Sequence, residues 1–189
     1  MELGLFGEIN AATIKNLTVQ GSVKATIPSS AYGSVYIAGV VASNQGKSTL
    51  ENVTSNVEVT VTGNGGGPII GGLSANAYSL TIQQCANLGN VTTENGTVAG
   101  LGSVSWGTVT VKCSYNSGNI SGTTGNVGGL CSGSANINFS YNTGKVTATT
   151  GKAGGLTGAA GGTSMNCYTV GEAFGDKSAS CWTVYATSN

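Results

Sequence analysis

Short stretches in which one apolar residue stands between two polar residues recur along the whole chain. When they are aligned on one another, the apolar position is filled by Ile14, Leu50, Ile82, Val111, Ile137 and, in the last stretch, Ser164. The preceding position holds Thr13, Thr49, Thr81, Thr110, Asn136 and Thr163, and the following one holds Lys15, Glu51, Gln83, Lys112, Asn138 and Met165. This alternation is typical of a strand with one buried face. β-branched residues dominate and no segment sustains a helical period, which also favours strands.

A second pattern shows that these strands belong to an internal repeat. A glycine followed by an apolar residue occurs six times, at Gly4-Leu5, Gly39-Val40, Gly72-Leu73, Gly100-Leu101, Gly129-Leu130 and Gly155-Leu156. We call this step the box. Each box is followed by an anchor position, occupied by Gly21, Val57, Gly89, Gly118, Gly144 and Gly171, and the spacing shortens from about 36 to 26 residues. Two residues after the anchor an apolar column returns as Val23, Val59, Val91, Ile120, Val146 and Ala173. A period in this range indicates a repeat architecture.

The repeat predicts the fold. Each unit contains about three short strands joined by glycine-rich corners, and it buries its apolar face only when units stack. We therefore predict an all-β protein that forms a right-handed parallel β-solenoid (β-helix) of about six coils. The right hand follows from the general bias of parallel crossovers. Residues 1–171 hold the six repeats, and residues 172–189, where "CWTV" (181–184) echoes "CYTV" (167–170), form a shortened last coil that acts as a cap.

The stretch "NVGGLCSG" (126–133) shows what the box is expected to do. Val127 and Leu130 face the core across a bend. Gly128 and Gly129 supply backbone freedom at that bend and allow a close backbone approach that a Cβ atom would block.

The boxes and the blocks that follow them resemble the GLUG motif repeats. The boxes that match are "IGGLSAN" (70–76), "VAGLGSV" (98–104), "VGGLCSG" (127–133) and "AGGLTGA" (153–159), and the blocks include "FSYNTG" (139–144) and "NCYTVG" (166–171). The first two repeats are degenerate, and Val57 replaces the anchoring glycine. GLUG repeats occur in large bacterial surface proteins, including non-catalytic parts of some immunoglobulin A peptidases. The resemblance implies a segment of such a protein and brings no catalytic residues.

The composition of the chain argues against nucleic acid and anionic membranes as binding partners. Charged residues make up 7% of the 189 residues, the formal net charge is zero, and Arg and His are absent. A chain with so few charges and no net positive charge is not expected to bind nucleic acid or an anionic membrane tightly. No apolar run approaches the roughly 18 residues of a membrane helix, so no membrane insertion is expected in this segment. No export signal opens the chain and a box begins at once, so we expect a segment of a longer protein.

Catalytic chemistry has few candidates. Asp176 is the only Asp, and the Glu residues are scattered, with Glu51 and Glu58 among the closest in sequence. A polysaccharide-acting β-helix needs paired carboxylates or a basic group in a groove. The absence of His and of a CxxC pair argues against zinc. We predict no enzyme activity, no cofactor and no metal.

An aromatic column is the leading candidate for ligand binding. Tyr115, Tyr141 and Tyr168 are equivalent in the repeat, and Trp182 continues them in the last coil. Two interpretations stay open: a stripe that stacks on glycan rings, or a structural ladder in which each ring packs on its neighbour, and we favour the ladder. One position on, Asn87, Asn116 and Asn142 predict a hydrogen-bonded asparagine ladder.

The cysteines and threonines have simple interpretations. Cys85 and Cys167 share a column with Leu17 and Val53, which predicts small buried hydrophobic residues, and Cys167 with Cys181 is the most plausible disulfide pair. The threonine columns raise the idea of an ice-binding solenoid, but charged residues such as Lys24 and Glu94 interrupt them.

These observations together favour a non-enzymatic structural or interaction module of a secreted, cell-surface bacterial protein, as a stalk or adhesin segment. The alternative is a glycan-binding adhesin that uses an exposed tyrosine column. A host or cell-wall glycan or protein is the expected partner. The repeat anchors expected to hold the fold are Gly39, Gly72, Leu73, Gly100, Leu101, Gly129, Leu130, Gly155 and Leu156.

Overall fold

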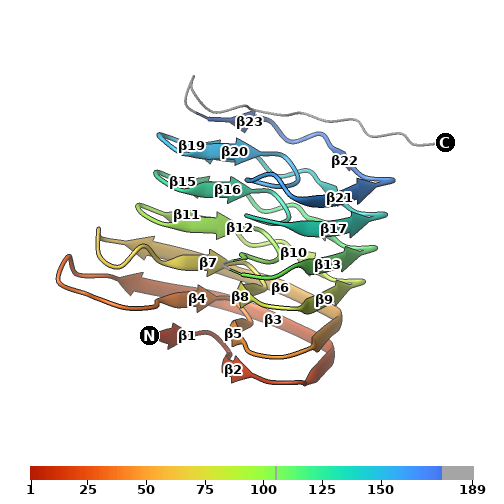
Figure 1. Ribbon diagram of the computed structural model, residues 1–189, viewed down its shortest axis with the longest axis horizontal. Helices are drawn as coiled ribbons and strands as arrows, with labels where there is room; N and C mark the ends of the chain where they lie inside the picture. Colours follow the sequence, from red (N-terminus) through yellow and green to blue (C-terminus); the bar gives the residue numbers. More distant parts are fainter. Residues whose placement is uncertain (105, 176–189) are drawn as a thin grey trace.

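The structure is a computed structural model that describes residues 1–104 and 106–175. Every regular element in this part of the chain is a β-strand, and the strands lie in three sheets whose named pairings are all parallel (Figure 1). No helix in the described residues is long and apolar enough to cross a membrane. The protein is thus all-β, with parallel strands in curled sheets, an arrangement compatible with a β-solenoid.

The first sheet has six strands, one from each repeat, in the order of the sequence. They are β1 (Glu2–Leu3), β4 (Tyr36–Ala38), β7 (Ile69–Gly71), β12 (Thr97–Ala99), β16 (Asn126–Gly128) and β20 (Lys152–Gly154). Each strand leads into a box, so this sheet places the box glycines of successive repeats over one another.

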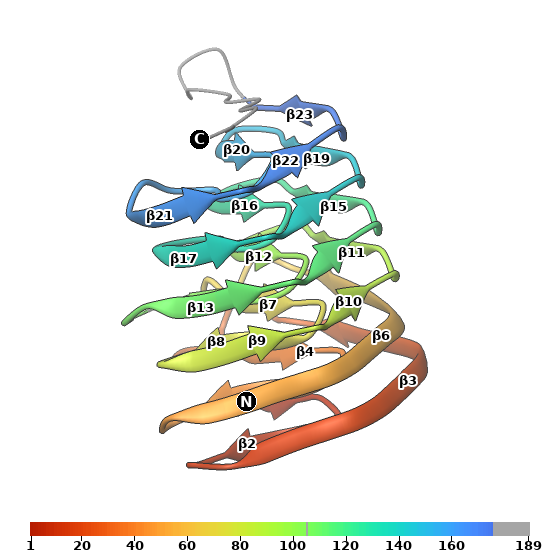
Figure 2. The same cartoon turned by 90° about the vertical axis from the view of Figure 1, so that its right-hand side faces the viewer.

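The largest sheet has 14 strands and curls around the opposite side (Figure 2). Its first two repeats contribute one long strand each, β3 (Thr13–Thr26) and β6 (Ser48–Thr62). In the later repeats the same path is divided into three strands. The first row is β9 (Leu80–Gln83), β13 (Val109–Lys112), β17 (Ala135–Asn138) and β21 (Gly162–Met165); the second row is β10 (Ala86–Asn87), β14 (Tyr115–Asn116), β18 (Tyr141–Asn142) and β22 (Tyr168–Thr169); the third row is β11 (Val91–Thr93), β15 (Ile120–Gly122), β19 (Val146–Ala148) and β23 (Ala173–Phe174).

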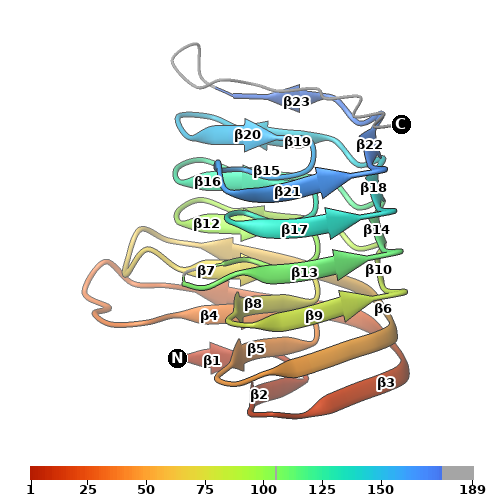
Figure 3. The same cartoon turned by 45° about the vertical axis from the view of Figure 1, so that its right-hand side comes forward.

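A small third sheet follows the boxes of the first three repeats. It consists of β2 (Phe6–Ile9), β5 (Val41–Asn44) and β8 (Ser74–Ala77). Isolated parallel bridges continue the same line from Ser74 to Gly102, Cys131 and Thr157. The three sheets together stack repeat on repeat (Figure 3).

The strand register matches the columns read from the sequence. Ile14 pairs with Leu50, Leu50 with Ile82, and Ile82 with Val111. The column after the anchor pairs likewise from Val23 to Ala173, as Val23–Val59, Val59–Val91, Val91–Ile120, Ile120–Val146 and Val146–Ala173. A slip of one residue would turn the apolar side chains outward, so the alternating pattern excludes that slip. The repeat columns of unlike residue types, such as the box glycines and the asparagines, exclude longer slips.

The apolar side chains form two buried clusters between the sheets. One gathers the box leucines with the first row of the large sheet, for example Leu73, Leu101 and Ile82. The other gathers the six-stranded sheet with the third row, for example Val98, Val127 and Ile120. Burial falls at the first repeat, where Leu5 is 54% exposed and the outer edge of β3 has no partner strand in the described chain.

One corner uses the left-handed backbone conformation without glycine. Positive φ values near 50° occur at Asn16, Asn52, Gln84, Cys113, Phe139 and Asn166. These residues are equivalent, since each lies two positions after the apolar residue of the first row. Asn tolerates this conformation, whereas residues such as Phe adopt it only at a cost in free energy.

The prediction about the box glycines is half right. Val127 and Leu130 are fully buried, as expected. Neither Gly128 nor Gly129 has a left-handed φ, so backbone freedom is not the reason for glycine. Glycine is required here by the close approach of the backbone. A Cβ atom on Gly128 would lie 1.7 Å from the carbonyl oxygen of Cys131, and a Cβ atom on Gly129 would lie 2.1 Å from the carbonyl oxygen of Gly155.

Candidate functional site

The tyrosine column lies on the outer side of the second row of the large sheet. Tyr115 pairs with Tyr141 and Tyr141 with Tyr168 in the strand register. The ring centroids are 5.0 Å apart at both steps, and the ring planes are within 5° of parallel. The rings therefore stack face to face, which is the arrangement of a structural ladder.

This stacking limits what the column offers to a ligand. The ring faces between Tyr115 and Tyr168 are occupied by one another, so their edges and hydroxyl groups are what solvent reaches. Partial burial, and secondarily the two neighbouring tyrosines, raise the pKa of Tyr141. Trp182, the fourth member predicted for the column, lies outside the described residues, as does Cys181 of the predicted disulfide.

The asparagine ladder is buried one position further on. Asn87 Nδ2 donates to Asn116 Oδ1 at 2.7 Å, and Asn116 Nδ2 donates to Asn142 Oδ1 at 2.7 Å. Each Nδ2 also donates at 2.8 Å to the carbonyl oxygen of its own repeat's anchor glycine. The three side chains are completely buried, so these hydrogen bonds pair amide groups that water does not reach. Asn87 Oδ1, at the start of the ladder, is buried without a hydrogen-bond partner among the described residues.

The box glycines and the asparagine ladder pack against each other. A Cβ atom on Gly72 would lie 2.5 Å from Asn87 Cγ, and one on Gly100 would lie 2.6 Å from Asn116 Cγ. Gly129 has the same relation to Asn142, while Gly39 faces Ser55 and Gly155 faces Thr169. The sequence showed both columns but not that they touch. Their contact leaves no room for a Cβ atom at Gly72, Gly100 and Gly129, which explains why these three box positions hold glycine.

The box leucines anchor the core. Leu73, Leu101 and Leu130 are completely buried, and Leu156 is nearly so. Their backbones are also linked, since the N–H of Leu73 donates to the carbonyl of Leu101, and that of Leu101 to Leu130. These residues hold repeats together and face no solvent, so a direct role in binding is not open to them.

The four described cysteines are free thiols. Cys85, Cys131 and Cys167 are buried, in agreement with the prediction for Cys85 and Cys167, whereas Cys113 is exposed. Burial raises the pKa of the Cys85 thiol to about 11 and that of Cys131 to about 12. Raised pKa values keep these thiols protonated and unreactive.

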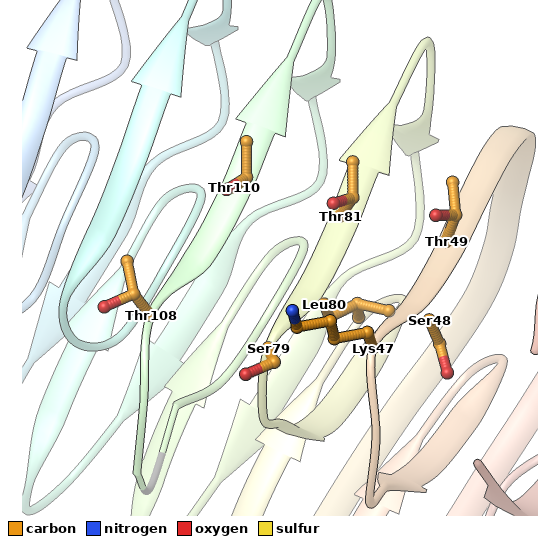
Figure 4. A pocket seen from close by; sticks show the side chains of 8 residues that line it. All are labelled: Lys47, Ser48, Thr49, Ser79, Leu80, Thr81, Thr108 and Thr110. Atoms are coloured by element: carbon orange, nitrogen blue, oxygen red, sulfur yellow. The ribbon is translucent and has the colours of Figure 1, made fainter. Parts of the chain in front are cut away.

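The first row of the large sheet carries a polar hollow on its outer face (Figure 4). This pocket of about 290 Å³ is lined by Lys47, Ser48, Thr49, Ser79, Leu80, Thr81, Thr108 and Thr110. Thr49, Thr81 and Thr110 are consecutive register partners in the threonine column. The sequence revealed that column, but not that the residues before each strand deepen it into a hollow.

Metal-binding and acid–base groups do not converge in the described part of the chain. It contains no cluster of three or more potential metal-ligating side chains. The ion pair between Lys145 Nζ and Glu172 Oε2, at 3.7 Å, joins two exposed side chains. Such a pair contributes little to stability.

Comparison with known proteins gives no relative: no family model, no curated protein and no solved structure matches the chain. The likeness to GLUG repeats therefore stays a prediction from the motifs.

Proposed function

We propose that the chain is a non-enzymatic structural module of a secreted, cell-surface bacterial protein, built as a GLUG-type, right-handed parallel β-solenoid of about six coils. It serves as a stalk that holds other parts of its protein at a distance. The observation that carries this proposal is the unbroken register of the columns from β3 to β21. Each repeat presents to the next the same set of apolar residues, so length is gained by repetition and not by new contacts.

The side-chain ladders support a mechanical role for the module, because they join successive repeats. The buried Asn87–Asn116–Asn142 ladder and the stacked tyrosines tie successive repeats together along the stacking direction. These links lie beside the backbone hydrogen bonds of the parallel sheets and add directional contacts to nondirectional packing.

One column holds two glutamates but keeps them far apart, which gives no support to catalysis by that pair. Glu58 and Glu172 fall in one column, but Asn90, Asn119 and Lys145 stand between them in successive repeats. Four steps of about 4.8 Å separate them by about 19 Å. Paired carboxylates that hydrolyse glycosides lie about 5–10 Å apart.

The adhesin alternative, with the tyrosine column as its binding face, has weaker support. A sugar ring stacks on the face of an aromatic ring, and the stacked column presents mainly ring edges. A glycan array with a Tyr141→Ala control separates the two functions: binding that disappears in the variant would favour the adhesin.

Two experiments test the stalk. An antibody raised against the domain should label intact cells of the source organism, and external protease should remove the label. Signal found only after lysis would refute the surface location.

The second experiment removes residues 127–152, one whole repeat. Because Val127 is the register partner of Ala153, joining Asn126 to Ala153 keeps every column aligned. We expect a folded protein that is about 5 Å shorter by small-angle X-ray scattering. A shortened chain that does not fold would contradict a stalk built from equivalent units.

A further inference from the structure

The polar pocket on the first row combines residues from three successive repeats. Lys47, Ser48 and Thr49 come from the second repeat, Ser79, Leu80 and Thr81 from the third, and Thr108 and Thr110 from the fourth. In Figure 4 the lysine side chain extends across the hollow toward Ser79, and the three threonines of the column stand in a row along one side. The pocket exists only because the repeats are in register.

Most of its hydroxyl groups are unused by the protein. Ser48 is buried and its Oγ accepts the N–H of Ala12. The hydroxyls of Thr49, Ser79, Thr81, Thr108 and Thr110 make no hydrogen bond to any described residue. Five hydroxyls, each both donor and acceptor, therefore face one hollow and are open to a polar ligand.

The pocket carries one unneutralised positive charge. Lys47 Nζ forms no ion pair with any described residue, and no carboxylate is among the lining residues. Lys145, in contrast, is paired with Glu172. A lone ammonium group surrounded by hydroxyls matches a ligand that bears an acidic group and many hydroxyls.

Two exposed aromatic side chains belong to the loops that form the pocket. Tyr78, directly before Ser79, is 44% exposed, and Trp106, two residues before Thr108, is 80% exposed. The two loops touch, since a Cβ atom on Gly107 would lie 3.0 Å from a ring carbon of Tyr78. Neither ring is among the residues that line the pocket, but both lie on the loops that carry lining residues, where an exposed aromatic side chain can contact the apolar part of a ligand.

We propose that this pocket binds an acidic sugar, a pyranose unit with a carboxylate, as part of a glycan. The carboxylate pairs with Lys47, and the sugar hydroxyls bond to Ser79 and the threonines. The apolar face of the ring reaches Trp106, which belongs to the loop of Thr108 and lies outside the lining itself. The site does not use the tyrosine column, and it is independent of the stalk function.

The test is an NMR titration of the ¹⁵N-labelled chain with two acidic probes, a galacturonic acid trisaccharide and sialyllactose. The methyl ester of the trisaccharide is the uncharged control for the first. We expect at least one acid to shift the amide resonances of the pocket residues, and its ester or neutral parent lactose to bind about tenfold more weakly or worse. Binding should weaken as salt is raised, because the charge pair is exposed.

Three variants locate the site. Lys47→Met should remove the preference for the acid, and Trp106→Ala should weaken binding about tenfold. Lys152→Met, which removes an exposed lysine of β20, should change neither. Each variant is first checked for an unchanged circular dichroism spectrum.

The proposal is overturned if neither acid binds at millimolar concentration, if ester and acid bind alike, or if binding survives Lys47→Met. These results would leave the stalk function untouched, because surface labelling and repeat deletion test it separately.

Discussion

The asparagine ladder allows a sharp prediction about stability. Replacing Asn116 by alanine removes three hydrogen bonds: the one accepted from Asn87 and those donated to Asn142 and to the carbonyl of Gly118. Each contributes about 1 kcal/mol, and a buried partner left without a bond costs up to about 3 kcal/mol. Since Asn116 is completely buried, water does not replace these bonds. We expect a loss of about 3–5 kcal/mol in the free energy of unfolding, which is a large share of the 5–15 kcal/mol typical of a domain.

The matched control lies three residues away. Asn119 is exposed, and its Oδ1 accepts one bond, from the backbone N–H of Lys145 at 3.0 Å. Asn119→Ala should cost less than about 1 kcal/mol, because water takes over that bond. Asn116→Thr should be intermediate, since Thr169 occupies the equivalent position in the last repeat and still accepts from Asn142.

The assay is equilibrium unfolding in guanidinium chloride, followed by circular dichroism and tryptophan fluorescence. Coincident transitions are required, because repeat proteins can lose two-state behaviour. If Asn116→Ala and Asn119→Ala lower the stability equally, or if Asn116→Ala costs less than about 1 kcal/mol, the ladder does not hold the repeats together as argued.

Three further predictions follow from the packing of single residues. A Cβ atom on Gly129 would lie 2.1 Å from the carbonyl oxygen of Gly155, so Gly129→Ala should lower the free energy of unfolding in guanidinium chloride by about 3 kcal/mol or more. Gly7 has open space around it, so Gly7→Ala should change that free energy by less than about 1 kcal/mol. Equal effects of the two substitutions would refute the close approach. Phe139 is 60% exposed and is held at a φ of 49°, which a residue without strain in this region, such as asparagine, adopts more easily. Phe139→Asn should therefore raise the free energy of unfolding by about 1 kcal/mol and with it the melting temperature. A lower melting temperature would count against strain at this corner. Burial raises the pKa of Cys131 from 9.0 to about 12, so its contribution to stability is complete below pH 9 and is lost as the pH rises toward 12. Melting temperatures between about pH 8 and 11 should therefore fall less in Cys131→Ala, and an unchanged slope would contradict this; iodoacetamide at neutral pH should label Cys113 but not Cys131 in the folded chain.

The columns were predictable from the sequence because stacking makes equivalent positions alike. The alternation around Ile82 and Val111 fixed the register, and the tyrosines and asparagines were correctly grouped. Similar side chains recur at one spacing, so the repeats can be aligned from the sequence alone, and this alignment agrees with the strand pairing of the fold.

What the sequence did not reveal depends on contacts between columns. The box glycines face the asparagines across the core, which no spacing along the chain shows. The left-handed corner includes Gln84, Cys113 and Phe139. These residue types rarely adopt a positive φ, so the sequence does not predict this conformation. The polar pocket depends on the loops before β9 and β13, whose paths are set by packing and not by the repeat pattern.

The most direct test of the stacked register is a distance ruler made of spin labels. Nitroxides are attached to cysteines placed at Thr13 and Thr163 in one variant and at Thr49 and Thr163 in another, with Cys113 and Cys181 changed to serine. The register places the first pair five steps apart and the second four. Double electron–electron resonance should therefore give separations of about 24 Å and 19 Å, differing by one strand spacing of about 4.8 Å. Equal distances, or distances that differ by much more than one strand spacing of about 4.8 Å, would contradict the stacking.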